Sequence, residues 1–281
     1  MHNPISDSLR GIVIGTWMIG LLWFERRRAL RAVHRNKLRR DVRNFVIAAP
    51  AGAVVQALEM PVALKIAELA QERVWGVLPW FGLPRAVAMV AGILLLDYTL
   101  YWWHYLTHRV PALWRFHQVH HLDREMDATT ALRFHFGEIA ISVAFRAAQI
   151  AAIGASPLAV SIWQVFLFLC ILFHHSNVRL SLASERVLAR FVITPRLHGI
   201  HHSIAPQEVN SNWSSGLTIW DWFHSTLRTE VPQAALTLGV SGFLEGPETT
   251  ALEALAVPFR ASAQLPAYDR APVRQSLDAL S

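Results

Sequence analysis

Apolar segments with at most one charged residue each, separated by polar ones, are the most prominent pattern along this chain of 281 residues. Their lengths approach the roughly 20 residues that a helix needs to cross the hydrocarbon core of a bilayer. The segments are residues 11–24, 45–58, 86–103, 139–153 and 158–173. Segment 86–103 is interrupted only by Asp97 and would extend about 27 Å as a helix. The pattern therefore predicts helices that span a membrane.

Two details refine these spans. Gly154, Ser156 and Pro157 lie between the last two apolar segments, and these residue types favour a tight turn, so residues 139–173 predict a helical hairpin. Segment 45–58 is short for a span and becomes long enough only if its helix continues through Glu59 and Pro61.

A basic segment follows the first apolar one. Residues 25–43 hold nine basic and two acidic side chains, a net charge of +7, whereas the whole chain carries +6. Segment 11–24 follows Arg10 and has no small-residue cleavage motif after it, so we interpret it as a retained anchor. Basic residues concentrate in cytoplasmic loops beside spans, which explains this segment more economically than nucleic-acid binding does. We expect a cytoplasmic loop and no nucleic-acid partner.

Counting spans from this loop predicts where the later polar segments lie. Two spans separate it from Tyr105, and two more return the chain to the same side at His174. We expect an all-α integral membrane bundle of four or five spans or half-spans, with a cytosolic histidine-rich helical cap built from residues 104–135 and 174–228. The expected domains are an anchor helix with its basic loop (1–44), a membrane domain (45–228) and a cytosolic tail (229–281).

The composition agrees with a membrane protein. Hydrophobic residues make up 53% of the chain and charged residues 16%, whereas soluble domains average about 45–50% and about 25%. These values argue against a soluble globular enzyme and exclude a disordered chain. The single cysteine, Cys170, excludes an internal disulfide framework and a cysteine-based zinc ribbon. Any bound metal would need histidine or carboxylate ligands.

Histidines provide the candidate chemistry. Eight of the 14 histidines fall into three motifs: His104 and His108; His117, His120 and His121; and His198, His201 and His202. Residues three and four apart share a helix face, so each motif can direct several imidazoles toward one point. A single pair of histidines four residues apart often forms only a hydrogen-bonded polar face of a helix. Two copies of His-x-x-His-His, however, are not explained by packing. The motifs predict metal binding.

The number of ligands indicates how many ions bind. A structural zinc takes four ligands and a catalytic zinc usually three, so eight imidazoles predict two ions. Imidazole suits zinc, copper, iron and nickel equally, and the residues alone leave the metal open. The chain contains no His-Glu-x-x-His motif, which would place a base beside the ligands, and this argues against zinc-dependent hydrolysis.

Asp97 lies seven residues before His104, so Asp97, Tyr101, His104 and His108 fall on one face at helical spacing. An acidic residue inside a span predicts a functional role. We expect Asp97 to accept the free N–H of a histidine ligand and so to fix the tautomer of that ring.

Several strings resemble the fatty acid hydroxylase/sterol desaturase superfamily. They are residues 97–108 (DYTLYWWHYLTH), 116–121 (FHQVHH), 130–135 (TALRFH), 173–177 (FHHSN), 194–202 (TPRLHGIHH), Asn212-Trp213 and Trp220-Asp221. The resemblance covers roughly residues 90–226. It implies a membrane-bound oxygenase with a histidine-bound di-iron centre, which uses O2 to oxidise an unactivated C–H bond of a lipid, sterol-like or other long hydrophobic substrate. Hydroxylation and desaturation share one ligand set, so the sequence does not separate them.

The resemblance also implies which residues bind metal. The eight histidines of the motifs match the ligands of that family, and His175 is a ninth; His135 and His174 are possible additional ligands. Tyr101, Asn212 and Asp221, like Asp97, are expected near the site or its pocket, and zinc is a possible substitute for iron. Phe136 replaces the proline of the Arg-x-His-Pro-x-Glu pattern, and Trp213 and His224 also depart from family patterns. These departures concern substrate preference more than metal binding.

Electrons for such a reaction need a source. The chain has no haem-attachment cysteine pair, Rossmann glycine motif or P-loop, so we expect a separate electron donor of ferredoxin or cytochrome type, with its reductase. Two other classes stay open: a histidine-rich membrane metal transporter and a zinc-dependent membrane hydrolase.

Overall fold

The computed structural model describes residues 4–33 and 36–260, and it is built from helices, as predicted. Among these residues, four helices are long and apolar enough to cross a membrane: α2 with α3 (Lys37–Glu72), α4 (Arg85–Arg109), α6 (Phe136–Ile153) and α7 (Pro157–His175). Shorter helices follow or connect them: α5 (Pro111–His121), α8 (Leu182–Leu188), α9 (Pro195–His201), α10 (Pro206–Val209), α11 (Ile219–Phe223) and α12 (Ala251–Ala256).

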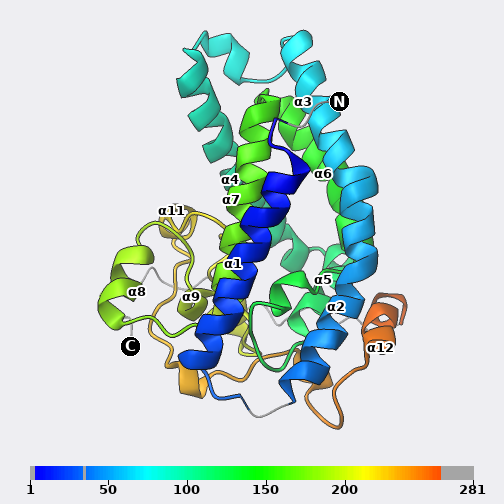
Figure 1. The fold of residues 1–281 in the computed structure, drawn as a ribbon, viewed down its shortest axis with the longest axis vertical. Helices are drawn as coiled ribbons and strands as arrows, with labels where there is room; N and C mark the ends of the chain where they lie inside the picture. Colours follow the sequence, from blue (N-terminus) through cyan, green and yellow to red (C-terminus); the bar gives the residue numbers. More distant parts are fainter. Residues whose placement is uncertain (1–3, 34–35, 261–281) are drawn as a thin grey trace.

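The long helices run alternately up and down and bring both parts of the cap to one end (Figure 1). α3 packs against α6, and α4 packs against α7. The start of α2, the end of α4, the start of α6 and the end of α7 all lie at the cap end, as the count of spans predicted. The side of the membrane on which this end lies stays a prediction.

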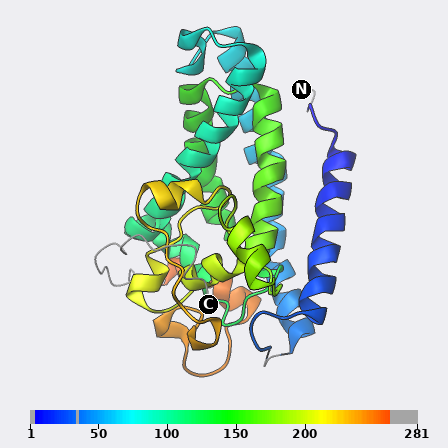
Figure 2. The ribbon, with the colours of Figure 1, turned by 90° about the vertical axis from the view of Figure 1, so that its left-hand side faces the viewer.

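The first helix, α1 (Asp7–Arg27), lies along the outside of the bundle beside α7 (Figure 2). Its buried Leu21 packs with Leu172 of α7, and Ile14 and Met18 pack against the same cluster. The predicted anchor 11–24 lies within α1, which is not one of the four helices that are apolar enough to span.

The predicted hairpin between α6 and α7 is present, and the geometry of its turn explains why glycine, serine and proline occur there. Gly154 ends α6 with φ of 76°, and an added Cβ would lie 2.3 Å from the carbonyl oxygen of Trp75, so only glycine fits. Ser156 then caps α7 by accepting the N–H of Ala159, and Pro157 occupies its first turn.

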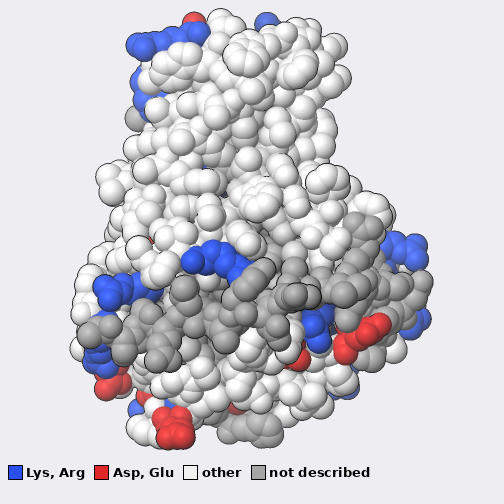
Figure 3. Space-filling view, turned by 180° about the vertical axis from the view of Figure 1, so that it is seen from behind, with Lys and Arg blue, Asp and Glu red and all other residues white. Residues whose placement is uncertain are grey.

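Charged side chains gather over the cap and at the opposite tip of the bundle, and the surface between them is largely free of charge on the face in Figure 3.

The basic segment 25–43 is not simply a solvated loop. Lys37 and Arg40 begin α2 and form ion pairs with Glu25, Glu125 and Asp127. These pairs bind the ends of α1 and α2 to the cap.

Candidate metal centre

Nine buried histidines converge at the cap end of the long helices. They form two groups, and within each group one ligand nitrogen per ring lies within 4.8 Å of all the others. The first group is His104, His108, His117, His121 and His201, and the second is His120, His175, His198 and His202. The structure thus brings together all nine histidines that the sequence and its family resemblance predicted as ligands.

The grouped histidines come from four helices, two long and two short, that meet at the cap end. His104 and His108 lie in the last turns of α4, and His175 ends α7. α5 and α9 each begin with proline and carry one copy of His-x-x-His-His. Consecutive residues on a helix point about 100° apart, so the adjacent histidines of each copy enter different groups. One motif therefore supplies ligands to both groups.

Unpaired ring nitrogens test whether metal ions fit these groups. Within the part of the chain that the structure describes, four of the five rings in the first group have a buried Nε2 with no hydrogen-bond partner: His108, His117, His121 and His201. Buried polar atoms nearly always have partners in proteins, so a protein-only explanation leaves this cluster unsatisfied. Cations bound by these lone pairs would satisfy it, and the donor set fits two metal ions.

The second group shows the convergence most directly. Nε2 of His175 lies 2.9 Å from Nε2 of His120 and 3.0 Å from Nε2 of His198. Nδ1 of His175 donates to the carbonyl oxygen of Ile171 at 2.8 Å, so its Nε2 carries a lone pair and has no proton for either neighbour. A cation is the natural partner for these nitrogens.

The first group is oriented in the same way, by oxygen atoms behind the rings. Nδ1 of His104 donates to the carbonyl oxygen of Trp213 at 2.7 Å, and Nδ1 of His201 donates to that of Ser211 at 2.9 Å. Nδ1 of His117 lies 2.8 Å from Oε1 of Glu138. Such acceptors fix the ring and its tautomer and leave Nε2 free to bind metal.

Burial keeps the rings in the form that binds metal. In α5, in α9 and at the residue that caps α9, desolvation and then the neighbouring histidines lower the pKa well below the usual 6.5. These residues are His120, His121, His198 and His202. Burial also lowers the pKa of His201 to about 3, against the opposing effect of its bond to Ser211. Neutral imidazoles at pH 7 hold lone pairs ready for a cation.

The two possible additional ligands lie outside both groups. His135 caps α6: its Nδ1 accepts the N–H of Gly137 at 2.9 Å, and its Nε2 lies 3.1 Å from the carbonyl oxygen of Leu255. Both of its nitrogens are therefore engaged. The ring centroid of His174 lies 3.9 Å from that of His198, beside the second group and without a ligand atom in it.

The expected role of Asp97 is wrong. Its Oδ2 accepts the backbone N–H of Leu217 at 3.0 Å and the indole N–H of Trp220 at 2.7 Å, and no hydrogen bond joins it to any histidine that the structure describes. Helical spacing placed Asp97 on the correct helix, but its partners come from a loop 120 residues later in the chain. Asp97 holds that loop against α4.

Asp221 and Asn212 support the centre through Trp213. Asp221 accepts the N–H groups of Trp213 and Ser214 at 2.8 and 2.9 Å and the hydroxyl of Thr226 at 2.7 Å. Asn212 adopts a left-handed backbone, with φ of 52°, and donates to the carbonyl oxygens of Leu197 and Arg228. These contacts fix the carbonyl that orients His104, so both are positioning residues.

Tyr101 belongs to the same network, because its hydroxyl lies 3.1 Å from Oγ1 of Thr226.

The oxygen acceptors behind the histidine rings were not predicted as site residues. Glu138 stood in the quoted family pattern and lies three residues after His135, a signal that could have found it. Every residue has a backbone carbonyl group, so the sequence could not identify those of Trp213 and Ser211 as acceptors.

A cavity of about 420 Å³ lies between the long helices and reaches histidines of both groups. His104 and His117 line it from the first group and His120, His175 and His198 from the second. Apolar side chains such as Leu100, Leu167 and Phe168 form much of the remaining wall. The cavity suits an apolar chain that ends beside the metal centre.

Comparison with known families gives a clear match. Residues 89–226 match the family model described as fatty acid hydroxylase. This segment is just under half of the chain, and it is similar to the fatty acid hydroxylase family. The resemblance drawn from the motifs is confirmed, and the matched residues include all nine grouped histidines.

Curated relatives of this chain have the names of a lipid hydroxylase, an alkylglycerol monooxygenase and a cholesterol hydroxylase. The chain is 32% identical over 161 residues to ornithine lipid hydroxylase OlsE of Rhizobium tropici (57% of this chain, 47% of that protein). It is 32% identical over 134 residues to alkylglycerol monooxygenase of Xenopus tropicalis (48% and 29%). It is 27% identical over 150 residues to cholesterol 25-hydroxylase of Mus musculus (52% and 49%). The matches span less than half the length of each relative, and no solved structure matches the chain.

Proposed function

We propose that this chain is a membrane-bound oxygenase that uses O2 to oxidise an unactivated C–H bond of a lipid or sterol-like substrate at two irons held by the nine histidines. The main supporting observation is that both histidine groups meet one apolar-walled cavity between helices long enough to cross a membrane. The names of the relatives, all hydroxylases or monooxygenases, favour hydroxylation over desaturation.

Iron fits the proposal better than zinc. The group of five imidazoles exceeds the three or four ligands that one zinc ion usually takes, and imidazole is a good ligand for iron. When bound, the irons supply the redox chemistry with O2 that removes hydrogen from the substrate carbon. Zinc is redox-inert, so zinc-loaded protein should be inactive.

The side chains of the chain itself perform three tasks. The neutral rings hold the metal, while Glu138 and the carbonyl groups of Trp213 and Ser211 keep Nδ1 protonated and the rings in place. The apolar cavity wall excludes water and aligns the substrate chain. Placement of the substrate along that wall decides which carbon is oxidised.

The substrate enters from the bilayer between α1 and α2. The cavity is lined by Ile14 of α1, Gly52 of α2 and Gln56 of the π-helical turn Val55–Glu59 that follows α2. The last two are also exposed on the surface. α1 and α2 stand apart in Figure 1, with α6 and α5 seen between them. A lipid chain can thus reach the histidines without leaving the membrane.

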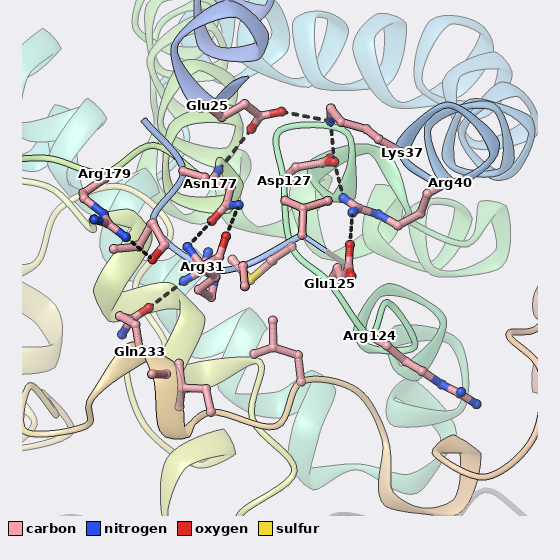
Figure 4. A pocket seen from close by; sticks show the side chains of 18 of the residues that line it. Glu25, Arg31, Lys37, Arg40, Arg124, Glu125, Asp127, Asn177, Arg179 and Gln233 are labelled. Carbon is pink, nitrogen blue, oxygen red and sulfur yellow. Dashed lines mark hydrogen bonds and ion pairs between the residues drawn. The ribbon is translucent and has the colours of Figure 1, made fainter. Parts of the chain in front are cut away.

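Electrons come from a separate carrier that docks at the cap, where a second pocket of about 1130 Å³ opens (Figure 4). Six basic and three acidic side chains line this pocket, and the acidic ones pair with Lys37 and Arg40. Arg31 in its wall donates to the carbonyl oxygen of Ser176, the residue after His175. An acidic carrier, of ferredoxin or cytochrome type, suits this face and would sit close behind the second group.

The test measures metal and product together. The protein is produced with iron-57, purified in detergent, and examined by elemental analysis and Mössbauer spectroscopy; lipid extracts are then incubated with it, a reductant and O2. We expect two coupled irons per chain and lipid products heavier by one oxygen atom that contain label from 18O2. Stoichiometric zinc with no iron under iron-rich growth would overturn the proposal in favour of the hydrolase or transport alternatives.

A further inference from the structure

Polar side chains occupy the end of the substrate cavity farthest from the histidines. Arg146 of α6 and Gln164 of α7 line it there, together with Glu59, which ends the π-helical turn Val55–Glu59 between α2 and α3. Arg146 is only 7% exposed although it lies within a span. Ionisable residues at membrane depth usually serve a function.

Several atoms of this cluster have no hydrogen-bond partner among the described residues. Nε of Arg146 lies 3.5 Å from Oε1 of Glu59 without a hydrogen bond, and Oε1 of Gln164 and Nη1 of Arg10 are likewise buried and unpaired. All three side chains line the cavity. The cavity therefore offers both hydrogen-bond donors and an acceptor to a group that enters it.

The guanidinium of Arg146 is held in place before anything binds. Its Nη1 donates to Oε1 of Gln149 at 3.0 Å, and its Cζ lies 4.5 Å from the ring centroid of Trp163. The π-helical turn brings Glu59 to the same level, and such turns occur frequently at functional sites. A preorganised guanidinium loses little freedom when a ligand arrives.

The distance from the histidines follows from helix geometry. Arg146 lies eight residues after Glu138, the partner of His117, which corresponds to about 12 Å along α6. Gln164 lies eleven residues before His175, or about 16 Å along α7. An extended chain held here would present a carbon well removed from its polar group to the metal centre.

We propose that Arg146, Gln164 and Arg10 bind an uncharged oxygen group of the lipid, a hydroxyl or a carbonyl, and so determine which carbon meets the histidines. Glu59 balances Arg146, and Asp7 lies one helical turn before Arg10, so the cluster carries no net charge that would favour an anion. An additional buried charge would be costly. This inference rests on the proposed function for its consequence, the choice of carbon.

Binding without turnover tests the inference. The metal-loaded protein in nanodiscs, under nitrogen and without reductant, binds tritiated 1-hexadecanol in competition with unlabelled 1-hexadecanol, hexadecane or palmitate. We expect hexadecanol to compete at about tenfold lower concentration than hexadecane, the difference that one net hydrogen bond provides. Equal competition by the two would overturn the inference, and tightest binding of palmitate would overturn the assignment to an uncharged group.

Gln164→Leu is the decisive variant, because the unpaired oxygen that it removes leaves no protein partner unsatisfied. It should reduce the preference for hexadecanol to less than threefold, whereas Phe168→Leu, a change in the apolar wall, should weaken both probes alike. An unchanged tenfold preference in Gln164→Leu would contradict the inference. If hexadecanol is preferred over hexadecane but the protein binds no iron and forms no oxygenated product, the result contradicts the proposed function alone.

Discussion

Oε1 of Glu138 lies 2.8 Å from Nδ1 of His117, and both side chains are buried. Glu138 belongs to the first turn of α6, a long apolar helix, whereas His117 belongs to α5 in the cap. The contact therefore joins the cap to the bundle at the metal centre. It also directs the unpaired Nε2 of His117 toward the first group.

Glu138→Ala should lower iron affinity by about tenfold to a hundredfold, the range found when the oxygen partner of a metal-binding histidine is lost. The ring of His117 would lose its fixed orientation. Iron per chain after dialysis against increasing chelator measures the effect. Glu138→Gln is the matched control, because its amide oxygen can still accept the Nδ1 proton. Equal iron retention in the alanine variant and the unaltered protein would rule out this role.

Each histidine group should hold its own ion. His201→Ala removes a ligand from the first group, and His120→Ala removes one from the second, so each variant should retain about one iron per chain instead of two. His135→Ala should keep both irons and lose about 1 kcal/mol of stability, because His135 caps α6. Elemental analysis decides between these outcomes, and loss of iron in His135→Ala would return this residue to the list of ligands.

The helical bundle and eight of the nine grouped histidines were predictable because both depend on short-range periodicity, whereas His175 was predicted from the family resemblance. Apolar runs of span length gave the long helices, and spacings of three and four residues gave the faces that carry His117 and His120. The basic segment and the histidines lie at one end because an even number of spans separates them.

Contacts between distant segments were not predictable in this way. Asp97 shares a helix face with His104, but a loop 120 residues away supplies its partner Leu217. The pairing of Glu59 with Arg146 depends on a π-helical turn, which changes the register of the helix and leaves no clear pattern in the sequence.

Asp97→Asn should leave two irons per chain, because the contacts of Asp97 are to Leu217 and Trp220 and not to a ligand. The substitution replaces a charged acceptor that two N–H groups share, so we expect a loss of about 1–3 kcal/mol in stability. Metal analysis and thermal melting of the same preparation separate the two effects. Loss of one iron at unchanged melting temperature would show that Asp97 acts on the metal centre after all.

Reversing charge at the cap should slow electron delivery and leave the site intact. Arg26 and Arg179 are exposed and line the pocket of Figure 4, so Arg26→Glu with Arg179→Glu should lower turnover with an acidic carrier about tenfold at low salt. The deficit should shrink as salt screens the charges. Turnover with a small chemical reductant should not change. A deficit of equal size with both reductants would locate the damage in the site instead.

Acid should destabilise the metal-free protein, and the buried histidines determine the range. Burial holds the pKa of His121, His198 and His202 well below 6.5 and that of His201 at about 3, whereas the unfolded chain titrates near 6.5. Between these values the unfolded state binds more protons, so stability rises with pH there and is lost progressively below about pH 6.5. Each such ring contributes up to about 1.4 kcal/mol per pH unit. Melting temperatures of the iron-free protein from pH 8 to pH 5 should be level at first and then fall, and less steeply in His201→Gln. A flat profile down to pH 5 would mean that these rings are not buried in the neutral form.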